Sequence, residues 1–497
     1  MKKAFKVFLV TASLMLVFFS FSAFGEEGKA VSEESVQITA IENCVGRMKI
    51  SWEAFPEATA YEIQKKTEGG KWGKAVVTEK TFHEDGKTKN GKIYTYRVRA
   101  VTEEGKSGYS DISNMYLGSP VIKSVKNTDG GLLVKWKKCT VATGYEVYRK
   151  TEDAKEYTLI ASLEGNTPSY TDKRVTSGKK YSYKVKQLSG EYISASKAEG
   201  TSAVFVSKVK KLSASNSPKG VTLSWSKVKG AKGYSVWRKT GENGKWIKAG
   251  VTGSGSKTSF TDKKTAYGKK NYYKVRAYRN SEVYGTFSME SFVFSVNPNK
   301  PMVALTYDDG PYPPATNRIL DTLEKHGARA TFFVVGSRIP VYADCIRREA
   351  ALGCEIANHT YSHPILTGCE PETIREEIEK TDKLIKEYSL QTPSLVRAPG
   401  GAVSEKVREN VKHPLVNWSV DTLDWDHRTP SKTIAVVKSR AFDGAIILMH
   451  DLHVPTATAS ETIIPWLINQ GYQLVTVSEM MDAKGITVEN GSLYTRA

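Results

Sequence analysis

The sequence predicts a multidomain protein in which three β-sandwich modules are followed by a distorted β/α barrel. Its 497 residues exceed what one hydrophobic core ordinarily organises, so several domains are expected. A short strand pattern that contains one tryptophan occurs three times within the first 300 residues. Beyond that point, continuous apolar runs alternate with amphipathic stretches, which is typical of a parallel sheet covered by helices.

Each repeat begins with a strand that ends in tryptophan, and nine residues later a tyrosine opens a second strand. Apolar and polar residues alternate in these strands, which predicts one buried face for each. We therefore expect β-sandwiches over residues 36–118, 119–203 and 204–296, with the repeated aromatic residues in their cores. These residues are Trp52, Trp136 and Trp225, then Tyr61, Tyr145 and Tyr234, and in a later strand Tyr96, Tyr183 and Tyr273. The units resemble fibronectin type III domains, and this resemblance implies spacer or adhesive modules.

The segment Ser295–Pro301 contains two prolines and two asparagines and predicts a linker. After it, the apolar runs Met302–Tyr307, Ala330–Val335 and Ala445–Met449 predict buried parallel strands. Apolar residues at helical spacing predict a helix over Pro371–Tyr388. We expect residues 297–497 to form a small or incomplete β/α barrel, a fold that holds its active site at the C-terminal ends of its strands.

The N-terminus has the pattern of a secretory signal over residues 1–25, because lysines precede the apolar run Val7–Phe24. We expect cleavage after Gly25 and a secreted, cell-wall-associated protein. The run has 18 residues, so an uncleaved membrane anchor is the alternative. Five cysteines predict no disulfide framework in an exported chain of this length, and buried free thiols are expected unless Cys345 pairs with Cys354.

The positive charge is confined to the sandwich region. Residues 301–497 carry 20 Lys and Arg against 25 Asp and Glu, a net charge of −5. Because the whole chain has a net charge of +19, the first 300 residues carry +24. For an exported chain this predicts binding to an anionic cell-wall polymer that bears phosphate or carboxylate groups. Export makes nucleic acid an unsuitable partner, whereas a merely solubilising charge remains an alternative.

Carboxylates and imidazoles follow the expected barrel strands. Asp308 and Asp309 end the first apolar strand, and two adjacent carboxylates repel each other unless a cation or proton neutralises one. His359 and His363 are four residues apart, so one helical turn would bring both imidazoles to the same side, as Zn²⁺ binding requires. Thr360 stands where a metalloprotease motif would have glutamate, so the base must come from elsewhere, and Asp308 is available.

Three further segments end predicted strands: Arg397–Gly401, Asp421–Trp425 and Ile447–Asp451. Taken singly, their residues have ordinary explanations, such as ion pairs, helix caps or core packing. Together with the Asp and His segments, and in this order, they resemble the polysaccharide deacetylases of carbohydrate esterase family 4, the NodB-type domain. The resemblance covers roughly residues 300–482.

The resemblance implies a catalytic divalent metal, Zn²⁺, with Asp309, His359 and His363 as its protein ligands. It implies that Asp308 is the catalytic base that takes a proton from the attacking water. Arg397 would pair with Asp308 and keep it ionised and oriented.

The resemblance also implies that His450 is the general acid, and that Asp424 holds its imidazole and raises its pKa. The backbone N–H of Gly400 would stabilise the oxyanion, and Trp425 and Leu448 would line the acetyl pocket. An aromatic residue is common in the family where this chain has Gly400. The backbone donor survives this change, but the groove is expected to be reshaped.

We expect the barrel to remove N-acetyl groups from N-acetylglucosamine units of an extracellular glycan. The signal, the basic region and the resemblance favour peptidoglycan over chitin-like polymers and poly-N-acetylglucosamine. An O-acetyl xylan esterase is the enzymatic alternative. A non-catalytic wall-binding adhesin is the alternative from another class.

Overall fold

The computed structural model describes residues 30–497, so the expected signal at residues 1–25 lies outside the described residues. Within 30–497, no helix combines the length and the apolar character that crossing a membrane requires. The chain divides into two compact units, of which one contains residues up to Ser124, 134–170 and 182–202. The other contains residues 125–133, 171–181 and 203–497.

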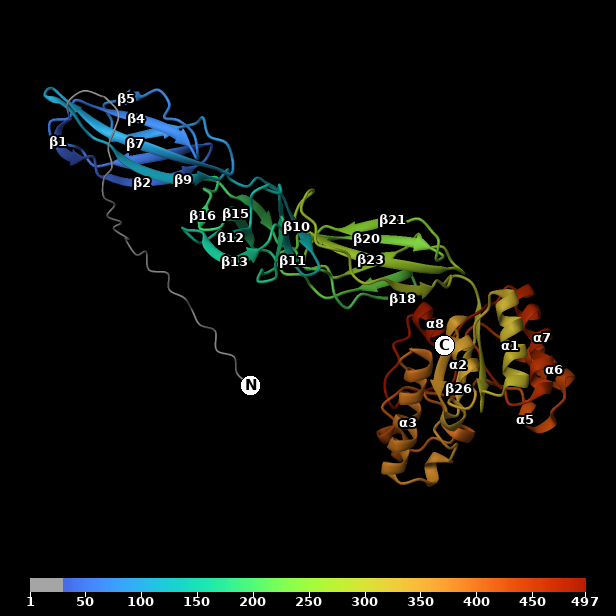
Figure 1. Ribbon diagram of the computed structural model, residues 1–497. Coiled ribbons are helices and arrows are strands. Elements are labelled where there is room, and N and C mark those ends of the chain that lie inside the picture. The colour runs from blue at the N-terminus through green and yellow to red at the C-terminus, as the bar shows by residue number, and fades with distance from the viewer. Residues whose placement is uncertain (1–29) are drawn as a thin grey trace. The chain divides into compact units, whose positions relative to one another are not determined.

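The first repeat consists of two β-sheets, shown in Figure 1. One sheet has the order β2-β3-β6, and the other has the order β1-β8-β7-β4-β5 with β9 also paired to β7. The strands are β1 (Ala30–Ser35), β2 (Ile38–Cys44), β3 (Arg47–Trp52), β4 (Ala60–Thr67), β5 (Val76–Thr78), β6 (Phe82–Asp85), β7 (Lys92–Thr102), β8 (Gly105–Gly108) and β9 (Ser110–Tyr116). Trp52 packs edge-on against Tyr61, with 5.4 Å between ring centroids. This aromatic pair lies in the core of the repeat, as predicted.

The second and third repeats follow the same plan. The second has sheets β10-β11-β14 and β13-β12-β15-β16, with β17 paired to β15, and the third has sheets β18-β19-β22 and β21-β20-β23-β24. The strands are β10 (Ile122–Thr128), β11 (Gly131–Trp136), β12 (Gly144–Thr151), β13 (Thr158–Glu164), β14 (Ser169–Asp172), β15 (Lys180–Ser189), β16 (Tyr192–Ile193), β17 (Thr201–Val204), β18 (Ser213–Ser217), β19 (Gly220–Ser224), β20 (Gly233–Thr240), β21 (Ile247–Thr252), β22 (Ser259–Asp262), β23 (Lys270–Tyr278) and β24 (Ser291–Phe294). Trp136 packs on Tyr145 and Trp225 on Tyr234, both with 5.2 Å between centroids. All four rings are buried, which confirms the predicted core positions.

The C-terminal region is a parallel sheet of order β27-β26-β25-β30-β29, in which β25 also pairs with β31. Parallel bridges at Val396 extend the sheet from β27 to β28, which pairs with β32. The strands are β25 (Met302–Asp308), β26 (Thr331–Val334), β27 (Glu355–Asn358), β28 (Leu415–Val416), β29 (Val420–Asp421), β30 (Ile446–His450), β31 (Gln473–Leu474) and β32 (Leu493–Tyr494). These short and irregular pairings are consistent with the predicted distorted β/α barrel.

Helices cover this sheet, with α1, α6 and α7 grouped on one side and α3 on the other (Figure 1). The helices are α1 (Pro313–His326), α2 (Ala343–Ala351), α3 (Pro371–Ser389), α4 (Glu405–Asn410), α5 (Asp424–His427), α6 (Pro430–Arg440), α7 (Val454–Asn469) and α8 (Val477–Lys484), and Gly336–Arg338, Leu366–Gly368 and Pro399–Gly401 form short 3₁₀ turns. The predicted helix over Pro371–Tyr388 is confirmed by α3. The three predicted apolar strands are confirmed as β25, β26 and β30. All five cysteines are free thiols, of which Cys345 and Cys354 are buried as expected, whereas Cys44, Cys139 and Cys369 are only half-buried.

Strand β25 shows how the core positions the candidate site. Its residues Val303, Leu305 and Tyr307 pack with the helices in one hydrophobic cluster. The alternate residues Met302 and Ala304 belong to the second cluster, on the opposite face of the sheet. Because side chains alternate along a strand, this second face continues through Thr306 to Asp308. The periodicity therefore turns Asp308 away from the helical layer, at the carboxyl end of the strand.

Candidate active site

Asp308 and Asp309 diverge because the backbone changes conformation between them. Asp308 is the last residue of β25 and is 3% exposed, whereas Asp309 adopts a left-handed conformation with φ of 71°. Thr360 and His363 also have positive φ, at 67° and 63°. Three non-glycine residues in this sparsely populated region are held there by the surrounding fold, and such strain is typical of functional sites.

Asp309, His359 and His363 meet with their ligand atoms all within 4.8 Å of one another. The Nε2 atoms of His359 and His363 lie 3.4 and 3.1 Å from the same oxygen, Oδ1 of Asp309. The Nδ1 atom of His359 lies 2.8 Å from the carbonyl oxygen of Arg397, which orients the ring and turns Nε2 toward the carboxylate.

The chemistry of this cluster fits a divalent cation. Oδ1 of Asp309 is buried and receives no well-formed hydrogen bond from residues 34–497, although two imidazole nitrogens face it. Burial by itself would raise the pKa of Asp309, but the contacts with His359 and His363 hold it well below its ordinary value. Lone pairs on two neutral imidazoles and a carboxylate repel one another unless a proton or a metal ion lies between them.

The predicted helical turn between His359 and His363 is wrong. Strand β27 ends at Asn358, and both histidines lie in the loop that follows it. The left-handed conformations of Thr360 and His363, rather than helical spacing, bring the two imidazoles together, with 4.9 Å between ring centroids. Asn358 supports this loop, because its side-chain oxygen accepts a hydrogen bond from the backbone N–H of Thr360 at 2.7 Å.

Arg397 holds one oxygen of Asp308. Its side chain is fully buried, and its Nη1 atom donates to Oδ1 of Asp308 at 2.6 Å and to the Thr306 hydroxyl at 2.8 Å. Nε and Nη2 donate to the carbonyl oxygens of Val416 and Asn417. The other oxygen of Asp308, Oδ2, faces Nε2 of His359 at 3.8 Å. Asp308 is therefore held by the Arg397 guanidinium on one side and presents its second oxygen to the cluster of Asp309, His359 and His363.

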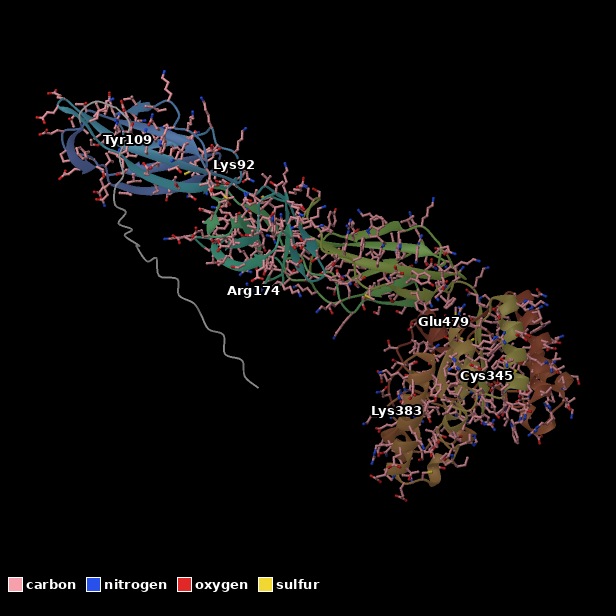
Figure 2. The ribbon with its side chains drawn as sticks, viewed as in Figure 1. Lys92, Tyr109, Arg174, Cys345, Lys383 and Glu479 are labelled. Atoms are coloured by element: carbon pink, nitrogen blue, oxygen red, sulfur yellow. The ribbon has the colours of Figure 1, made fainter. Side chains whose placement is uncertain are left out.

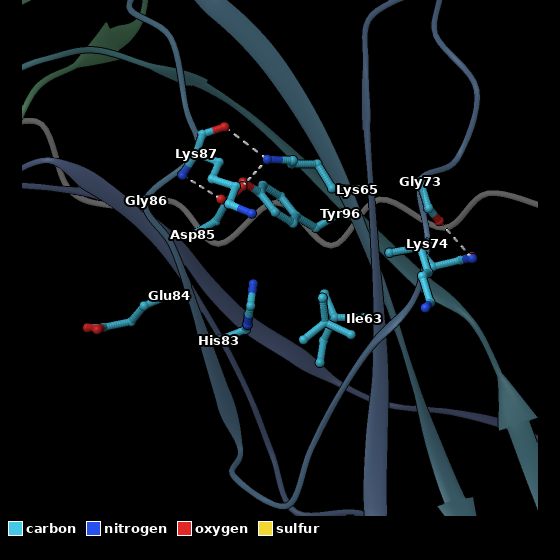
Figure 3. A pocket seen from close by; sticks show the side chains of 12 residues that line it. Ile63, Lys65, Gly73, Lys74, His83, Glu84, Asp85, Gly86, Lys87 and Tyr96 are labelled. Atoms are coloured by element: carbon cyan, nitrogen blue, oxygen red, sulfur yellow. Dashed lines mark hydrogen bonds and ion pairs between the residues drawn. The ribbon is translucent and has the colours of Figure 1, made fainter.

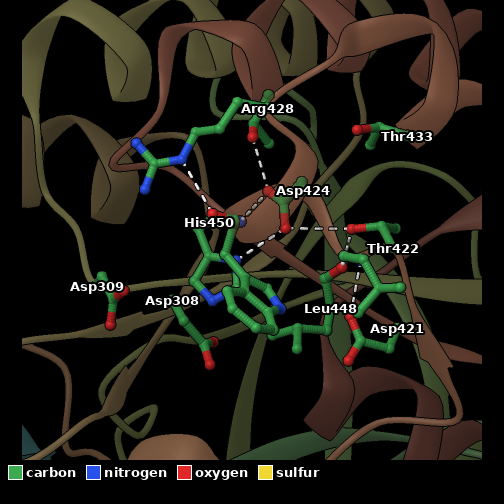
Figure 4. A network of polar contacts seen from close by, with 12 residues as sticks. Asp308, Asp309, Asp421, Thr422, Asp424, Arg428, Thr433, Leu448 and His450 are labelled. Atoms are coloured by element: carbon green, nitrogen blue, oxygen red, sulfur yellow. Dashed lines mark hydrogen bonds and ion pairs between the residues drawn. The ribbon is translucent and has the colours of Figure 1, made fainter.

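His450 and Asp424 form a second ionic pair, shown in Figure 4. Nδ1 of His450 lies 2.8 Å from Oδ1 of Asp424, and the backbone N–H of His450 donates to Oδ2 at 2.8 Å. Thr456 adds a hydroxyl donor to Oδ2 at 2.6 Å. Burial would lower the pKa of His450, but the hydrogen bond and charge of Asp424, joined by the charges of Asp308 and Asp309, raise it to about 9. The imidazole is therefore a cation at neutral pH and can donate a proton.

The strand register brings the two pairs together. In the parallel ladder between β25 and β30, Asp308 lies opposite His450 and Thr306 lies opposite Leu448. Two-residue periodicity turns Leu448 and His450 to the same face of β30. Asp308 and His450 thus stand side by side at the carboxyl ends of neighbouring strands, and Figure 4 shows both beside Leu448 and Asp309.

The three residues predicted to contact substrate have different surroundings. Leu448 is buried, with 3% exposure, whereas Trp425 is 48% exposed at the start of α5. Gly400 is exposed in the turn after Arg397, with φ of 67°, and a Cβ atom there would lie 3.4 Å from Cδ1 of Ile365. Their contacts with substrate remain a prediction.

Sequence reasoning assigned no role to Asp451 and Glu349, two carboxyl groups buried in the barrel. Asp451 is 1% exposed, accepts a hydrogen bond from the hydroxyl of Thr316, and lies where a Cβ on Gly310 would collide with its oxygens. Burial raises its pKa to about 7.

Glu349 is fully buried, and neither of its oxygens has a hydrogen-bond partner among residues 34–497. Burial, and after it the charge of Asp451, raises the pKa of Glu349 well above its ordinary value. The glycine at position 310 was the one sequence feature that could have pointed to Asp451, because a larger residue there would collide with its carboxylate. The sequence of α2 has no feature that singles out Glu349.

The first sandwich contains a cavity of about 400 Å³, and the polar residues that line it have a structural role (Figure 3). Its charged wall contains an ion pair between Lys65 and Asp85, and the Tyr96 hydroxyl donates to Asp85 at 2.7 Å. Burial would raise the pKa of Asp85, but the bonds from Lys65 and Tyr96 keep it below its ordinary value. The third sandwich repeats the arrangement, since Asp262 accepts from Arg238 at 2.6 Å and from Tyr273 at 3.1 Å. The same set of a basic residue, an aspartate and a tyrosine therefore recurs in two repeats, where it connects neighbouring strands. We interpret it as a structural feature of the sandwich.

Comparison with known proteins places the barrel in a family. The polysaccharide deacetylase family model matches residues 295–414. The peptidoglycan-N-acetylmuramic acid deacetylase PdaC of Bacillus subtilis is 41% identical over 190 residues, which are 38% of this chain and 41% of PdaC. The chain therefore matches less than half of the length of that relative.

Two other relatives are matched over most of their length. A peptidoglycan-N-acetylglucosamine deacetylase of Bacillus cereus is 35% identical over 197 residues, which are 38% of this chain and 72% of the relative. A chitooligosaccharide deacetylase of Rhizobium leguminosarum bv. trifolii is 35% identical over 189 residues, which are 35% of this chain and 88% of the relative. With its Asp, His and Arg side chains assembled at the carboxyl ends of the barrel strands, the chain belongs to the polysaccharide deacetylase family.

Proposed function

We propose that the barrel hydrolyses N-acetyl groups on N-acetylglucosamine units of an extracellular glycan, and that the glycan is peptidoglycan. The observation that carries this proposal is the pairing of Asp308 with His450 on neighbouring strands, beside the Asp309, His359 and His363 cluster. Hydrolysis of an amide requires both a base for the attacking water and an acid for the departing amine. The two Bacillus relatives named for peptidoglycan support the choice of glycan.

The proposed metal is Zn²⁺, held by Asp309, His359 and His363, because imidazole nitrogen and carboxylate oxygen suit this ion. The chemistry that a bound divalent cation supplies in such a site is Lewis acidity, which lowers the pKa of water and polarises a carbonyl group.

The remaining steps are assigned to the side chains of this chain. Asp308, held by Arg397 at 2.6 Å, accepts a proton from water through its second oxygen. His450, kept protonated by Asp424, donates a proton to the sugar amine as the C–N bond breaks. The backbone N–H of Gly400 stabilises the oxyanion, and Trp425 and Leu448 enclose the acetyl methyl group.

The sandwich repeats are proposed to be fibronectin type III-like modules that hold the enzyme at the cell wall. Their paired sheets and buried Trp–Tyr contacts support the assignment of fold. The charge of +24 in the first 300 residues supports an anionic wall polymer as their ligand. This proposal includes secretion by the N-terminal signal, with cleavage after Gly25.

Mass spectrometry of peptidoglycan fragments incubated with the full-length protein and Zn²⁺ tests this function. We expect release of acetate and loss of acetyl groups from N-acetylglucosamine. If acetyl groups are lost from N-acetylmuramic acid instead, the protein would have the activity for which PdaC of Bacillus subtilis is named. Acetate from acetylated xylan alone would establish the ester reaction. Tight binding to cell walls without acetate release from any N-acetylated glycan would favour the adhesin.

A further inference from the structure

Each β-sandwich repeat holds one aromatic ring between two cationic side chains, an arrangement that we call a cation clamp. One cation comes from the strand that follows the core tryptophan, the other from the later tyrosine-rich strand, and the ring from the connection after the first of these strands. In the first clamp, Lys66 and Arg97 both lie 4.4 Å from the Trp72 ring; in the second, Lys150 and Lys184 lie 5.2 and 4.1 Å from Tyr157; in the third, Lys239 and Lys274 lie 5.3 and 4.0 Å from Trp246.

The clamps occupy the outer face of the larger sheet. In β7 the residues on both sides of Arg97, Tyr96 and Val98, are buried, so alternation turns the Arg97 side chain away from the core. Lys184 in β15 and Lys274 in β23 lie between buried neighbours in the same way. All six cations and all three rings are half-buried. The clamp is therefore the same surface feature in three repeats.

Additional cation–ring contacts lengthen this surface. In the first sandwich, Arg97 also lies 4.1 Å from Tyr109, which is labelled in Figure 2. In the third, Lys274 lies 4.6 Å and Arg276 4.8 Å from Phe287, so this second ring contacts two cations of β23. A Lys or Arg that lies over a ring keeps N–H donors available for an acceptor beyond it.

Positive charge in the clamps exceeds the nearby negative charge. Among residues 34–497, no carboxylate lies within 4.0 Å of Lys66, Lys150, Lys184 or Lys274. Glu290 lies 3.5 Å from Lys239 in the third clamp, and Asp111 lies opposite Arg97 in the ladder between β7 and β9, so each of these two clamps has one acid beside two cations. Burial lowers the pKa of Lys274, and the charges of Lys239 and Arg276 lower it further against the opposing effect of Glu290. Like charges held together in this way favour an external anion.

We propose that each cation clamp binds a phosphodiester polymer whose phosphates are joined by polyol or sugar units. The proposal rests on the wall-binding role suggested above for the sandwiches and is independent of the deacetylation reaction. A tetrahedral phosphate presents oxygens in several directions, so it can accept from the two cations that flank one ring. The ring offers an apolar surface for the unit that joins neighbouring phosphates. Several weak sites in one protein suit a ligand with repeating phosphates, because such a polymer offers many equivalent positions at which a clamp can bind.

Binding of poly(glycerol phosphate) to the full-length protein tests this assignment. Lys150→Gln with Lys184→Gln removes the charge of the second clamp, and equivalent pairs of substitutions remove the others. We expect each pair to weaken binding about tenfold, the order expected for losing charge-assisted hydrogen bonds. Removing all three is expected to abolish binding at physiological salt. Arginine at both positions should retain binding, which separates loss of charge from loss of packing.

The matched control is Lys126→Gln with Lys135→Gln, which removes two exposed charges from β10 and β11. This control should bind as the unsubstituted protein does. Equal weakening by control and clamp variants would show that net charge alone drives binding and would overturn the proposal. Equal affinity for polyglutamate would overturn the choice of phosphate. Acetate release from soluble N-acetylglucosamine oligomers should be the same in all these variants, so failure of the clamps and failure of the enzyme are distinguishable.

Discussion

Asp424→Asn should move the basic limb of the pH–rate profile, because the carboxylate supports the protonated form of His450. The imidazole bonds to Oδ1 of Asp424 at 2.8 Å and has a pKa of about 9. An asparagine oxygen in place of Oδ1 can still accept from Nδ1, but the charge is removed, and an amide nitrogen in place of Oδ2 cannot accept from the backbone N–H of His450 or from Thr456. Burial then opposes protonation with less compensation, and the pKa should fall to about 6.5 or lower.

The size of the effect follows from the two pKa values. A change from about 9 to about 6.5 corresponds to roughly 3.4 kcal/mol of lost stabilisation of the imidazolium. At pH 8 the protonated fraction of His450 would fall from about 90% to about 3%, which predicts an approximately 30-fold lower rate. At pH 6 both proteins remain mostly protonated, so the ratio of their rates should be close to unity.

The assay is acetate release from N-acetylglucosamine oligomers, with kcat/KM measured across the pH range for both proteins. Asp421→Asn is the matched control, since Asp421 accepts from the backbone N–H of Leu423 and lies three residues before Asp424. An unchanged basic limb in Asp424→Asn, or the same shift in Asp421→Asn, would refute the assignment of His450 as an acid maintained by Asp424. Thermal unfolding of both variants checks that the barrel remains folded.

Three further predictions concern the metal-ligand cluster, a buried acid and a strained turn. Asp308→Asn should abolish acetate release yet retain the metal, as measured by mass spectrometry. His359→Ala should lose both activity and metal, because His359 is a proposed metal ligand and Asp308 is not. Burial raises the pKa of Glu349 in the folded barrel, so as pH rises above about 4.5 the unfolded carboxyl loses its proton before the folded one does. The stability of the unsubstituted barrel should therefore fall with rising pH by up to about 1.4 kcal/mol per unit, and Glu349→Gln should lack this contribution in urea unfolding. Gly400→Ala should cost about 1 kcal/mol of stability, because alanine disfavours a φ of 67°.

Each of these predictions has an opposing outcome. Activity retained by Asp308→Asn, or metal retained at full occupancy by His359→Ala, would contradict their assigned roles. A Glu349→Gln barrel with the pH dependence of the unsubstituted protein would mean that this carboxyl is ionised when folded. Equal unfolding midpoints for Gly400→Ala and the unsubstituted chain would show that the turn relaxes without strain.

The sequence alone determined the strands of the barrel and the aromatic cores of the repeats, because both follow from local periodicity. Met302–Tyr307 is apolar throughout and became β25, and Trp52 with Tyr61 formed a core pair. The helix over Pro371–Tyr388 was equally local, since one apolar face at helical spacing defines it. The resemblance to the deacetylases implied Asp309, His359 and His363 as metal ligands, and this assignment remains a proposal.

Only the tertiary structure decided how those residues meet. His359 and His363 come together through positive φ in a loop, which residue spacing does not encode. The parallel register sets Asp308 beside His450, and full burial of Arg397 fixes one oxygen of Asp308. The cation clamps likewise unite residues from separate strands. Such arrangements depend on strand pairing and packing over long sequence separations, whereas periodicity reports only on neighbouring residues along the chain.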